Sequence, residues 1–325
     1  MWRRCRVLLV KPRRLDVLIL AFAVVATGCV RSRAEPVGFT GPVDIGDGRT
    51  LFLDCQGWGS PTVFIIPGKG SYAEVWNVVV PPDDPVRSSP YDLIAQAKLE
   101  PSPDAAQPTV ARTTQVCAYD RPNTRPDGAD RSTPVRQPHT VQQDVDDLVK
   151  LVAATHLQGL FVVVAHSYGG LVADLLGRTH PELVSGLVMV DPTSEFLPTV
   201  GSPEQNAAFE TDAQVPAGPG GEGFLPNDAF ARIRAAPPLP TVPAIVLSSD
   251  KFPPLENLTP VNCTLSQIQQ ANSMLAAALG TTNDTDTDSG HNMMLYQPRL
   301  VADAIIDVVQ QTRGRKANPY RPLRA

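Results

Sequence analysis

One serine in this sequence stands where the chain leaves a buried strand and turns sharply into a helix. Residues 161–164 are apolar and predict a strand, while Gly169-Gly170-Leu171 opens a predicted helix. Ser167 lies on the turn between them, with the small residues Ala165 and Gly169 two positions before and after it. Such a turn exposes a serine hydroxyl and aims the amides at the helix start toward negative charge. The pattern A-x-S-x-G therefore favours serine nucleophilic chemistry over a helix entry with an incidental serine.

A serine nucleophile needs an imidazole to take its proton and a buried carboxylate to hold that imidazole in one tautomer. His291 follows Ser289-Gly290 in a polar loop late in the chain, where it could fold back over the strand ends, and it is the predicted base. The other histidines lie beside Ser167 or on and near predicted helices, and we interpret them as structural: His139, His156, His166 and His180.

The elements that must position these residues alternate along the chain. A hairpin at 42–45 and 50–55 precedes further predicted strands at 62–66, 115–119, 161–164, 183–190 and 242–247. Predicted helices lie at 91–99, 140–155, 169–178, 267–279 and 300–311. This order implies an α/β fold with a mostly parallel central sheet and helices on both faces. Residues 192–241 lack strand signals and are too long for a simple connection, so they predict an irregular cap between the sixth and seventh strands.

Taken in order, these landmarks resemble the α/β-hydrolase family over roughly residues 43–312. The strand ending in Pro67-Gly68 resembles the family's His-Gly turn, and residues 117–122 resemble the turn after its fourth strand. Residues 165–169 resemble the family's nucleophile elbow, and residues 289–291 resemble its histidine loop. The resemblance implies an α/β-hydrolase fold, the chain order serine, acid, histidine, and a serine hydrolase that uses neither a cofactor nor a metal.

The resemblance leaves the carboxylate open between two aspartates. In the family the acid usually follows the seventh strand, where this sequence has Phe252 in the matching position and Asp250 two residues earlier. A minority of the family, including some haloalkane dehalogenases, carry the acid directly after the sixth strand, where Asp191 lies. We favour Asp191 because both strand ends converge near the histidine loop. The alternatives are Asp250, a turn-capping role for Asp191, and Glu195 as a third choice.

Two backbone amides are expected to bind the oxyanion of the reaction. Tyr168, the residue after the nucleophile, supplies one, and Lys69, after the Pro67-Gly68 turn, supplies the other. Gly68 and Gly70 would let a substrate approach closely. The Lys69 side chain is interpreted as a solvated surface lysine, with attraction of an anionic substrate as the alternative.

The first 28 residues differ in character from the rest. Six basic residues precede the apolar run 17–26, which is short for a membrane span but suits an export signal. The run leads to Gly28-Cys29, which resembles a bacterial lipoprotein signal whose cleavage leaves a lipidated Cys29. We expect an exported protein held at the cell membrane by lipid, with residues 29–42 as a tether and 313–325 as a C-terminal tail. An ordinary secretory signal or an uncleaved anchor is the alternative.

Charge and cysteine content limit the partners. The full chain has a net charge of −5, and loss of residues 1–28 would leave the exported part at about −10, which argues against nucleic acid as a partner. Cys55, Cys117 and Cys263 would remain beside Cys29, and three cysteines cannot all pair. Their spacing does not match a metal site, so we expect no metal.

These features predict an exported hydrolase that cleaves a small-molecule or lipid carboxylic ester through an acyl group on Ser167. Haloalkane dehalogenases and epoxide hydrolases of the family use an aspartate nucleophile, so Ser167 argues against both activities. A serine-dependent haloperoxidase, peptidase or thioesterase stays open, as does a noncatalytic surface-binding protein on the same fold.

Overall fold

An eight-stranded sheet forms the centre of the molecule. The computed structural model describes residues 38–125, 128–155, 157, 159–216 and 220–317. In spatial order the sheet contains β1 (Phe39–Gly46), β2 (Arg49–Gln56), β6 (Val116–Asp120), β3 (Val63–Ile66), β7 (Phe161–Ser167), β8 (Val184–Pro192), β9 (Ala244–Leu247) and β10 (Asn283–Asp284). Strand β2 is antiparallel to both of its neighbours, and every other pairing in this sheet is parallel. The predicted mostly parallel sheet is confirmed.

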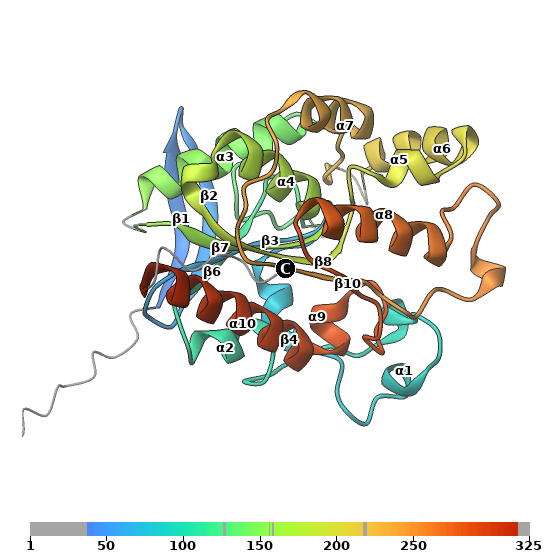
Figure 1. Cartoon of the computed structure of the whole chain (residues 1–325), viewed down its shortest axis with the longest axis horizontal. Helices are drawn as coiled ribbons and strands as arrows, with labels where there is room; N and C mark the ends of the chain where they lie inside the picture. Colours follow the sequence, from blue (N-terminus) through green and yellow to red (C-terminus); the bar gives the residue numbers. More distant parts are fainter. Residues whose placement is uncertain (1–37, 126–127, 156, 158, 217–219, 318–325) are drawn as a thin grey trace, which may run out of the picture. The chain divides into compact units, whose positions relative to one another are not determined.

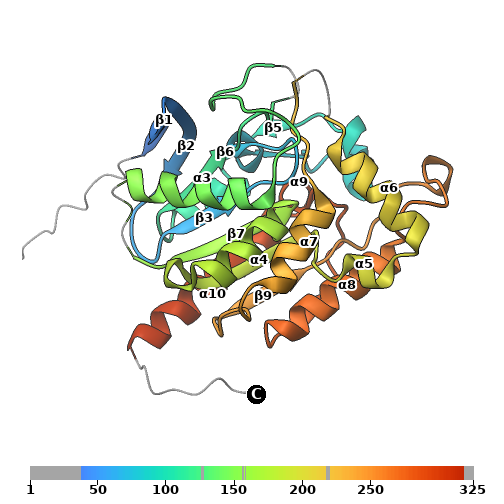
Figure 2. The ribbon, with the colours of Figure 1, turned by 90° about the horizontal axis from the view of Figure 1, so that it is seen from above.

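Helices cover both faces of this sheet (Figure 1, Figure 2). Helices α3 (Val141–Ala154) and α4 (Gly169–Thr179) lie on one face, and α2 (Ala106–Ala111) and α10 (Pro298–Ala317) lie on the other. Side chains alternate along a strand, so Val163 and Ala165 pack toward α3 and α4, while Val162 and Val164 pack toward α10. Strand β7 is buried on both faces because of these two helical layers, which explains its continuous apolar run.

Further elements lie outside the central sheet. They are α1 (Pro85–Ser88), α8 (Leu265–Ala278), α9 (Met293–Tyr296), the small pair β4 (Val78–Val79) and β5 (Glu100–Pro101), and single 3-10 turns at Ala73–Asn77, Ile94–Gln96, Pro181–Leu183 and Leu255–Asn257. The helix predicted at 91–99 is therefore only the turn Ile94–Gln96.

The cap between β8 and β9 is helical, which corrects the prediction that residues 192–241 are irregular. It contains α5 (Leu197–Val200), α6 (Pro203–Gln214) and α7 (Pro226–Ala235). Helix α6 begins at a capping box in which Ser202 and Gln205 satisfy each other's backbone amides. Few residues of α6 are buried, and its sequence shows little apolar periodicity. The capping box is therefore the main sequence signal for this helix. Helices α5 and α6 lie beside α8 at one end of the sheet (Figure 2).

The domain extends past both predicted limits of 43 and 312. Strand β1 takes in the last residues of the predicted tether 29–42, and α10 takes in the first residues of the predicted tail 313–325. The predicted signal peptide 1–28 and Cys29 lie outside the described residues. Among the helices that the structure does describe, none is both long enough and apolar enough to cross a membrane.

Of the three cysteines in the described residues, two form a disulfide. Cys55 of β2 and Cys117 of β6 face each other in the antiparallel register and are bonded, which ties the first hairpin to the parallel part of the sheet. Cys263 is free. A disulfide is typical of proteins in oxidising compartments.

Candidate active site

Ser167 sits on a strained, crowded turn between β7 and α4. Its φ of 51° lies in the left-handed region, which non-glycine residues seldom adopt. A Cβ on Gly169 would lie 2.4 Å from the Ile66 carbonyl oxygen, and a Cβ on Gly170 would lie 2.6 Å from Pro192 Cβ. Larger residues after the serine would therefore separate α4 from strands β3 and β8. The sharp turn predicted from the pattern A-x-S-x-G is present.

The structure brings His291 and Asp191 together. His291 Nδ1 donates to Asp191 Oδ2 at 2.6 Å. Asp191 ends β8 with a φ of 40°, is 2% exposed, and accepts two further hydrogen bonds from the Ser249 amide and hydroxyl at 3.0 and 2.9 Å. Burial alone would raise the pKa of Asp191, but these donors hold it below its ordinary value. Asp191 is therefore an ionised acceptor that places the imidazole proton on Nδ1 and leaves a lone pair on Nε2.

The loop that carries His291 is fixed by a residue that sequence reasoning missed. The Asp92 carboxylate accepts from the His291 amide at 2.9 Å and from the Tyr296 hydroxyl at 2.7 Å. A Cβ on Gly290 would lie 2.3 Å from the Asp92 carboxyl carbon, so only glycine fits before the histidine. The sequence offers no local signal for Asp92, because it lies far from His291 along the chain.

A second histidine, His166, contacts His291 through a hydrogen bond and its ring. His166 Nε2 donates to the His291 carbonyl oxygen at 2.9 Å, and the two rings lie 4.7 Å apart. Burial, together with the neighbouring His291, lowers the pKa of His166 to about 3, so its ring is neutral at physiological pH. The structural role predicted for His166 agrees with these contacts.

Asp250 and Glu195, the other predicted acids, have different partners. Asp250 accepts from the amides of residues 287, 288 and 289 at 3.2, 2.9 and 2.8 Å, so it shapes the loop before His291. Glu195 pairs with Arg178 at 2.5 Å. Of the candidate carboxylates, Asp191 is the one that reaches the His291 ring.

Ser167, Asp191 and His291 line one cavity of about 310 Å³ under the cap. Phe252, which occupies the family's usual acid position, is part of its wall. Most of the other wall residues come from α5, α6, α8 and the loop before α8: Leu197, Gln205, Ala208, Phe209, Leu258, Val261, Asn262, Cys263, Ile268 and Asn272. The cavity is thus mainly apolar, with a few amide groups, as is common for small-molecule sites.

The side chains of Lys69 and Tyr168, the predicted oxyanion residues, contact the cap and a neighbouring helix. The Lys69 ammonium donates to the carbonyl oxygens of Asp212 and Val215 at 3.2 and 2.8 Å, where it caps the end of α6. The half-buried Lys69 side chain therefore lies against the end of α6, a contact that neither predicted alternative included. The Tyr168 ring stacks on Phe224 at 3.9 Å, and its hydroxyl donates to Asp144. Only their backbone amides remain as candidate oxyanion donors.

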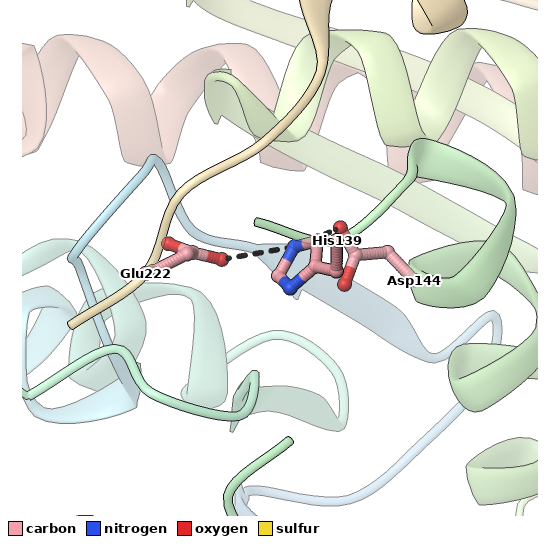
Figure 3. Close-up of side chains that lie close together, drawn as sticks. All are labelled: His139, Asp144 and Glu222. Atoms are coloured by element: carbon pink, nitrogen blue, oxygen red, sulfur yellow. Dashed lines mark ion pairs between the residues drawn. The ribbon is translucent and has the colours of Figure 1, made fainter. Parts of the chain in front are cut away.

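Within the described ranges, one group of buried side chains has the geometry of a metal site. Ligand atoms of His139, Asp144 and Glu222 lie within 4.8 Å of one another (Figure 3). Arg121 already binds Glu222, with its Nε 2.7 Å from Oε1. A metal ion would therefore have to compete with a guanidinium for the same carboxylate.

The fold and this geometry agree with the comparisons to known proteins. Residues 63–304 match the model of the alpha/beta hydrolase family, and the chain belongs to that family. Hydrolysis is the general class of activity that this membership supports. A stretch of 101 residues, 31% of this chain, is 31% identical to an uncharacterised protein of Schizosaccharomyces pombe, of which it spans 18%.

Solved structures share the fold at low sequence identity. An esterase from Thermogutta terrifontis superimposes with a TM-score of 0.53 at 17% identity, covering 86% of this chain and 99% of its own. A putative lipase from Acinetobacter baumannii gives a TM-score of 0.53 at 14% identity, covering 85% and 92%. Est816, described as an enzyme that degrades N-acyl homoserine lactones, gives 0.52 at 18% identity, covering 82% and 99%. At these identities the similarity shows the fold alone.

Proposed function

We propose that this protein is a serine hydrolase that cleaves carboxylic esters with Ser167, His291 and Asp191 as its catalytic triad. The observation that carries the proposal is the 2.6 Å hydrogen bond between His291 and Asp191 in the cavity that the strained Ser167 also lines. Family membership supports hydrolysis in general, and the serine supports an acyl intermediate.

The triad would act in two steps. The Ser167 hydroxyl oxygen attacks the ester carbonyl carbon while His291 Nε2 takes its proton, and Asp191 stabilises the resulting imidazolium. The carbonyl oxygen becomes an anion that the amides of Tyr168 and Lys69 would bind. Collapse of this intermediate expels the alcohol, which takes the proton from His291. Water then attacks the acyl group with His291 again as base, and this releases the acid and restores Ser167.

The cavity supports an ester with a small or medium apolar group. Its volume of about 310 Å³ lies at the low end for small-molecule sites. Phe209, Phe252 and Ile268 in its wall favour an alkyl or aryl group over a charged one. No metal or cofactor takes part in the proposed reaction.

The experiment for this proposal is a pre-steady-state measurement with p-nitrophenyl esters of increasing acyl length. An acyl-enzyme predicts a burst of p-nitrophenol with an amplitude near one equivalent of enzyme, followed by slower turnover. Matched p-nitroanilides and thioesters separate esterase from peptidase and thioesterase activity. Absence of turnover on the whole series would favour the noncatalytic binding protein.

The pH dependence follows from the contacts of His291. Burial lowers its pKa, but the hydrogen bond and charge of Asp191 outweigh burial and raise the pKa above the ordinary value of about 6.5. Because the base must be neutral, kcat/KM rises with pH, and its midpoint is expected above about 6.5. A profile of kcat/KM from about pH 5 to 9 measures this midpoint. A midpoint well below 6.5 would contradict the contact between Asp191 and His291.

We also propose that the protein is exported and anchored by lipid at Cys29. The disulfide Cys55–Cys117 and the basic and apolar segments of residues 1–28 support this. Lipid contributes about 0.8 kcal/mol for each buried methylene, so a diacyl group holds a protein at a membrane without a spanning helix. Mass spectrometry is expected to find a mature N-terminus at a lipidated Cys29, and Cys29→Ala is expected to release the protein from membranes. An intact Met1 terminus would show an uncleaved anchor.

A further inference from the structure

The turn that carries the Lys69 amide lies directly beside the nucleophile. A Cβ added to Gly68 would lie 3.0 Å from Ser167 Cβ and 2.9 Å from His166 Nδ1. An amide donor in such a turn is useful only if its direction is fixed before the oxyanion forms. The contacts that hold residues 67–70 therefore decide whether the turn can serve the reaction.

Arg121 binds the outer side of this turn. Its Nη1 donates to the Pro67 carbonyl oxygen at 2.7 Å, and its Nη2 donates to the Gly68 carbonyl oxygen at 2.6 Å. The Gly68 carbonyl and the Lys69 N–H belong to one peptide unit, which is trans, so they point in opposite directions. A guanidinium that fixes the carbonyl thereby fixes the direction of the Lys69 N–H. Its charge also polarises the peptide and strengthens the donor.

Glu222, which belongs to the cap, holds Arg121 in this position. Its two oxygens bind the Arg121 guanidinium at 2.7 and 3.2 Å, and Oε2 also accepts from the Gly70 amide at 2.6 Å. The Arg121 and Glu222 side chains are 1% and 0% exposed. Burial makes these contacts rigid, because neither charged group can exchange its partner for water without a large cost. Glu222 thus connects the cap to the turn in two ways, through Arg121 and through the Gly70 amide.

His139 and Asp144 lie close to Glu222 (Figure 3). His139 Nε2 lies 2.9 Å from Asp144 Oδ2 and 3.7 Å from Glu222 Oε1, and Asp144 accepts from the Tyr168 hydroxyl. Burial lowers the pKa of His139, but the two carboxylates outweigh burial and raise it. The Arg121 guanidinium already pairs with Glu222 in this group, which argues against a metal ion there.

We propose that Arg121 and Glu222 are positioning residues that orient the Lys69 amide as an oxyanion donor. The proposal rests on the proposed ester hydrolysis at Ser167. It makes Glu222 a residue through which the cap supports the oxyanion site, although Glu222 does not line the substrate cavity. Because a misplacement of about 1 Å can cost about 100-fold in rate, loss of this support should appear in kcat.

The test compares Glu222→Gln and Arg121→Lys with a matched control, Glu195→Gln. Glu195 is also a cap-segment carboxylate paired with an arginine, but its partner is the partly buried Arg178, and it does not touch the turn. For Glu222→Gln and Arg121→Lys we expect kcat to fall about 10- to 100-fold per active site, with KM changed less than about twofold. A trifluoromethyl ketone, which forms an oxyanion on the serine, should bind weaker by the same factor as kcat/KM falls. The control should keep both values.

A second readout does not depend on turnover. Hydrogen exchange at the peptide that contains residues 67–72 should speed up in Glu222→Gln and stay unchanged in Glu195→Gln. Unchanged kcat and unchanged exchange in a folded Glu222→Gln variant would overturn the proposal. So would an equal loss of kcat in the control, which would indicate a general effect of the cap. If the wild-type protein hydrolyses no ester, the proposed function fails, and the exchange measurement still decides whether Glu222 holds the turn.

Discussion

Replacing Ser167 with alanine is expected to lower kcat for p-nitrophenyl ester hydrolysis by at least about three orders of magnitude. The alanine cannot form the acyl intermediate, so only background hydrolysis at the site remains. The fold should survive, because the φ of 51° at this position is held by the surrounding turn and alanine adds no atom. Steady-state kinetics and a thermal unfolding curve of both proteins measure the two effects.

Turnover retained by Ser167→Ala would contradict the assignment of the nucleophile. The matched control is Cys263→Ser, which alters the free thiol in the cavity wall and should leave the burst of p-nitrophenol intact. If the burst is lost in Cys263→Ser and kept in Ser167→Ala, the acyl group is carried by the Cys263 thiol and not by Ser167.

Replacing Asp191 with asparagine is expected to lower kcat by about four orders of magnitude. An amide can donate to His291 Nδ1, which moves the ring proton to Nε2 and removes the base from Ser167. The same change removes the charge that raises the pKa of His291. The midpoint at which the residual kcat/KM rises with pH should therefore shift to lower pH. Rate measurements across the pH range test both effects.

Asp250→Asn is the matched control for Asp191→Asn. Its carboxylate accepts from three loop amides and does not contact the His291 ring, so the variant should lose stability more than catalytic rate. Equal and mild effects on kcat from both variants would mean that neither aspartate orients the histidine. A larger loss of kcat in Asp250→Asn than in Asp191→Asn would identify Asp250 as the catalytic acid.

Local pattern was enough to predict the strands of the central sheet except the two-residue β10, as well as the serine turn and most of the long helices. The run before Ser167 and the small residues around it specify a strand–turn–helix whatever lies elsewhere in the chain, and the fold class followed from the order of such segments. Helix α6 of the cap was missed because it is weakly amphipathic and is marked mainly by its capping box at Ser202 and Gln205.

Long-range partners were not predictable from one sequence. Asp92 reaches the His291 loop, and Glu222 reaches Arg121, across separations of about a hundred residues or more. Each looks like an ordinary acidic residue in its own segment. The contact of Lys69 with the end of α6 was missed for the same reason, since that helix was not predicted from the sequence. Such contacts arise only when distant elements pack together.

Covalent labelling with a fluorophosphonate tests the assignment of Ser167 most directly. The probe requires a serine that is activated by its base, so it reports the assembled triad and not only the residue type. We predict one adduct per protein molecule, mapped by peptide mass spectrometry to Ser167, blocked by prior incubation with a trifluoromethyl ketone and strongly slowed by Asp191→Asn. A folded wild-type protein that takes up no label, or takes it up at a residue other than Ser167, would contradict the account.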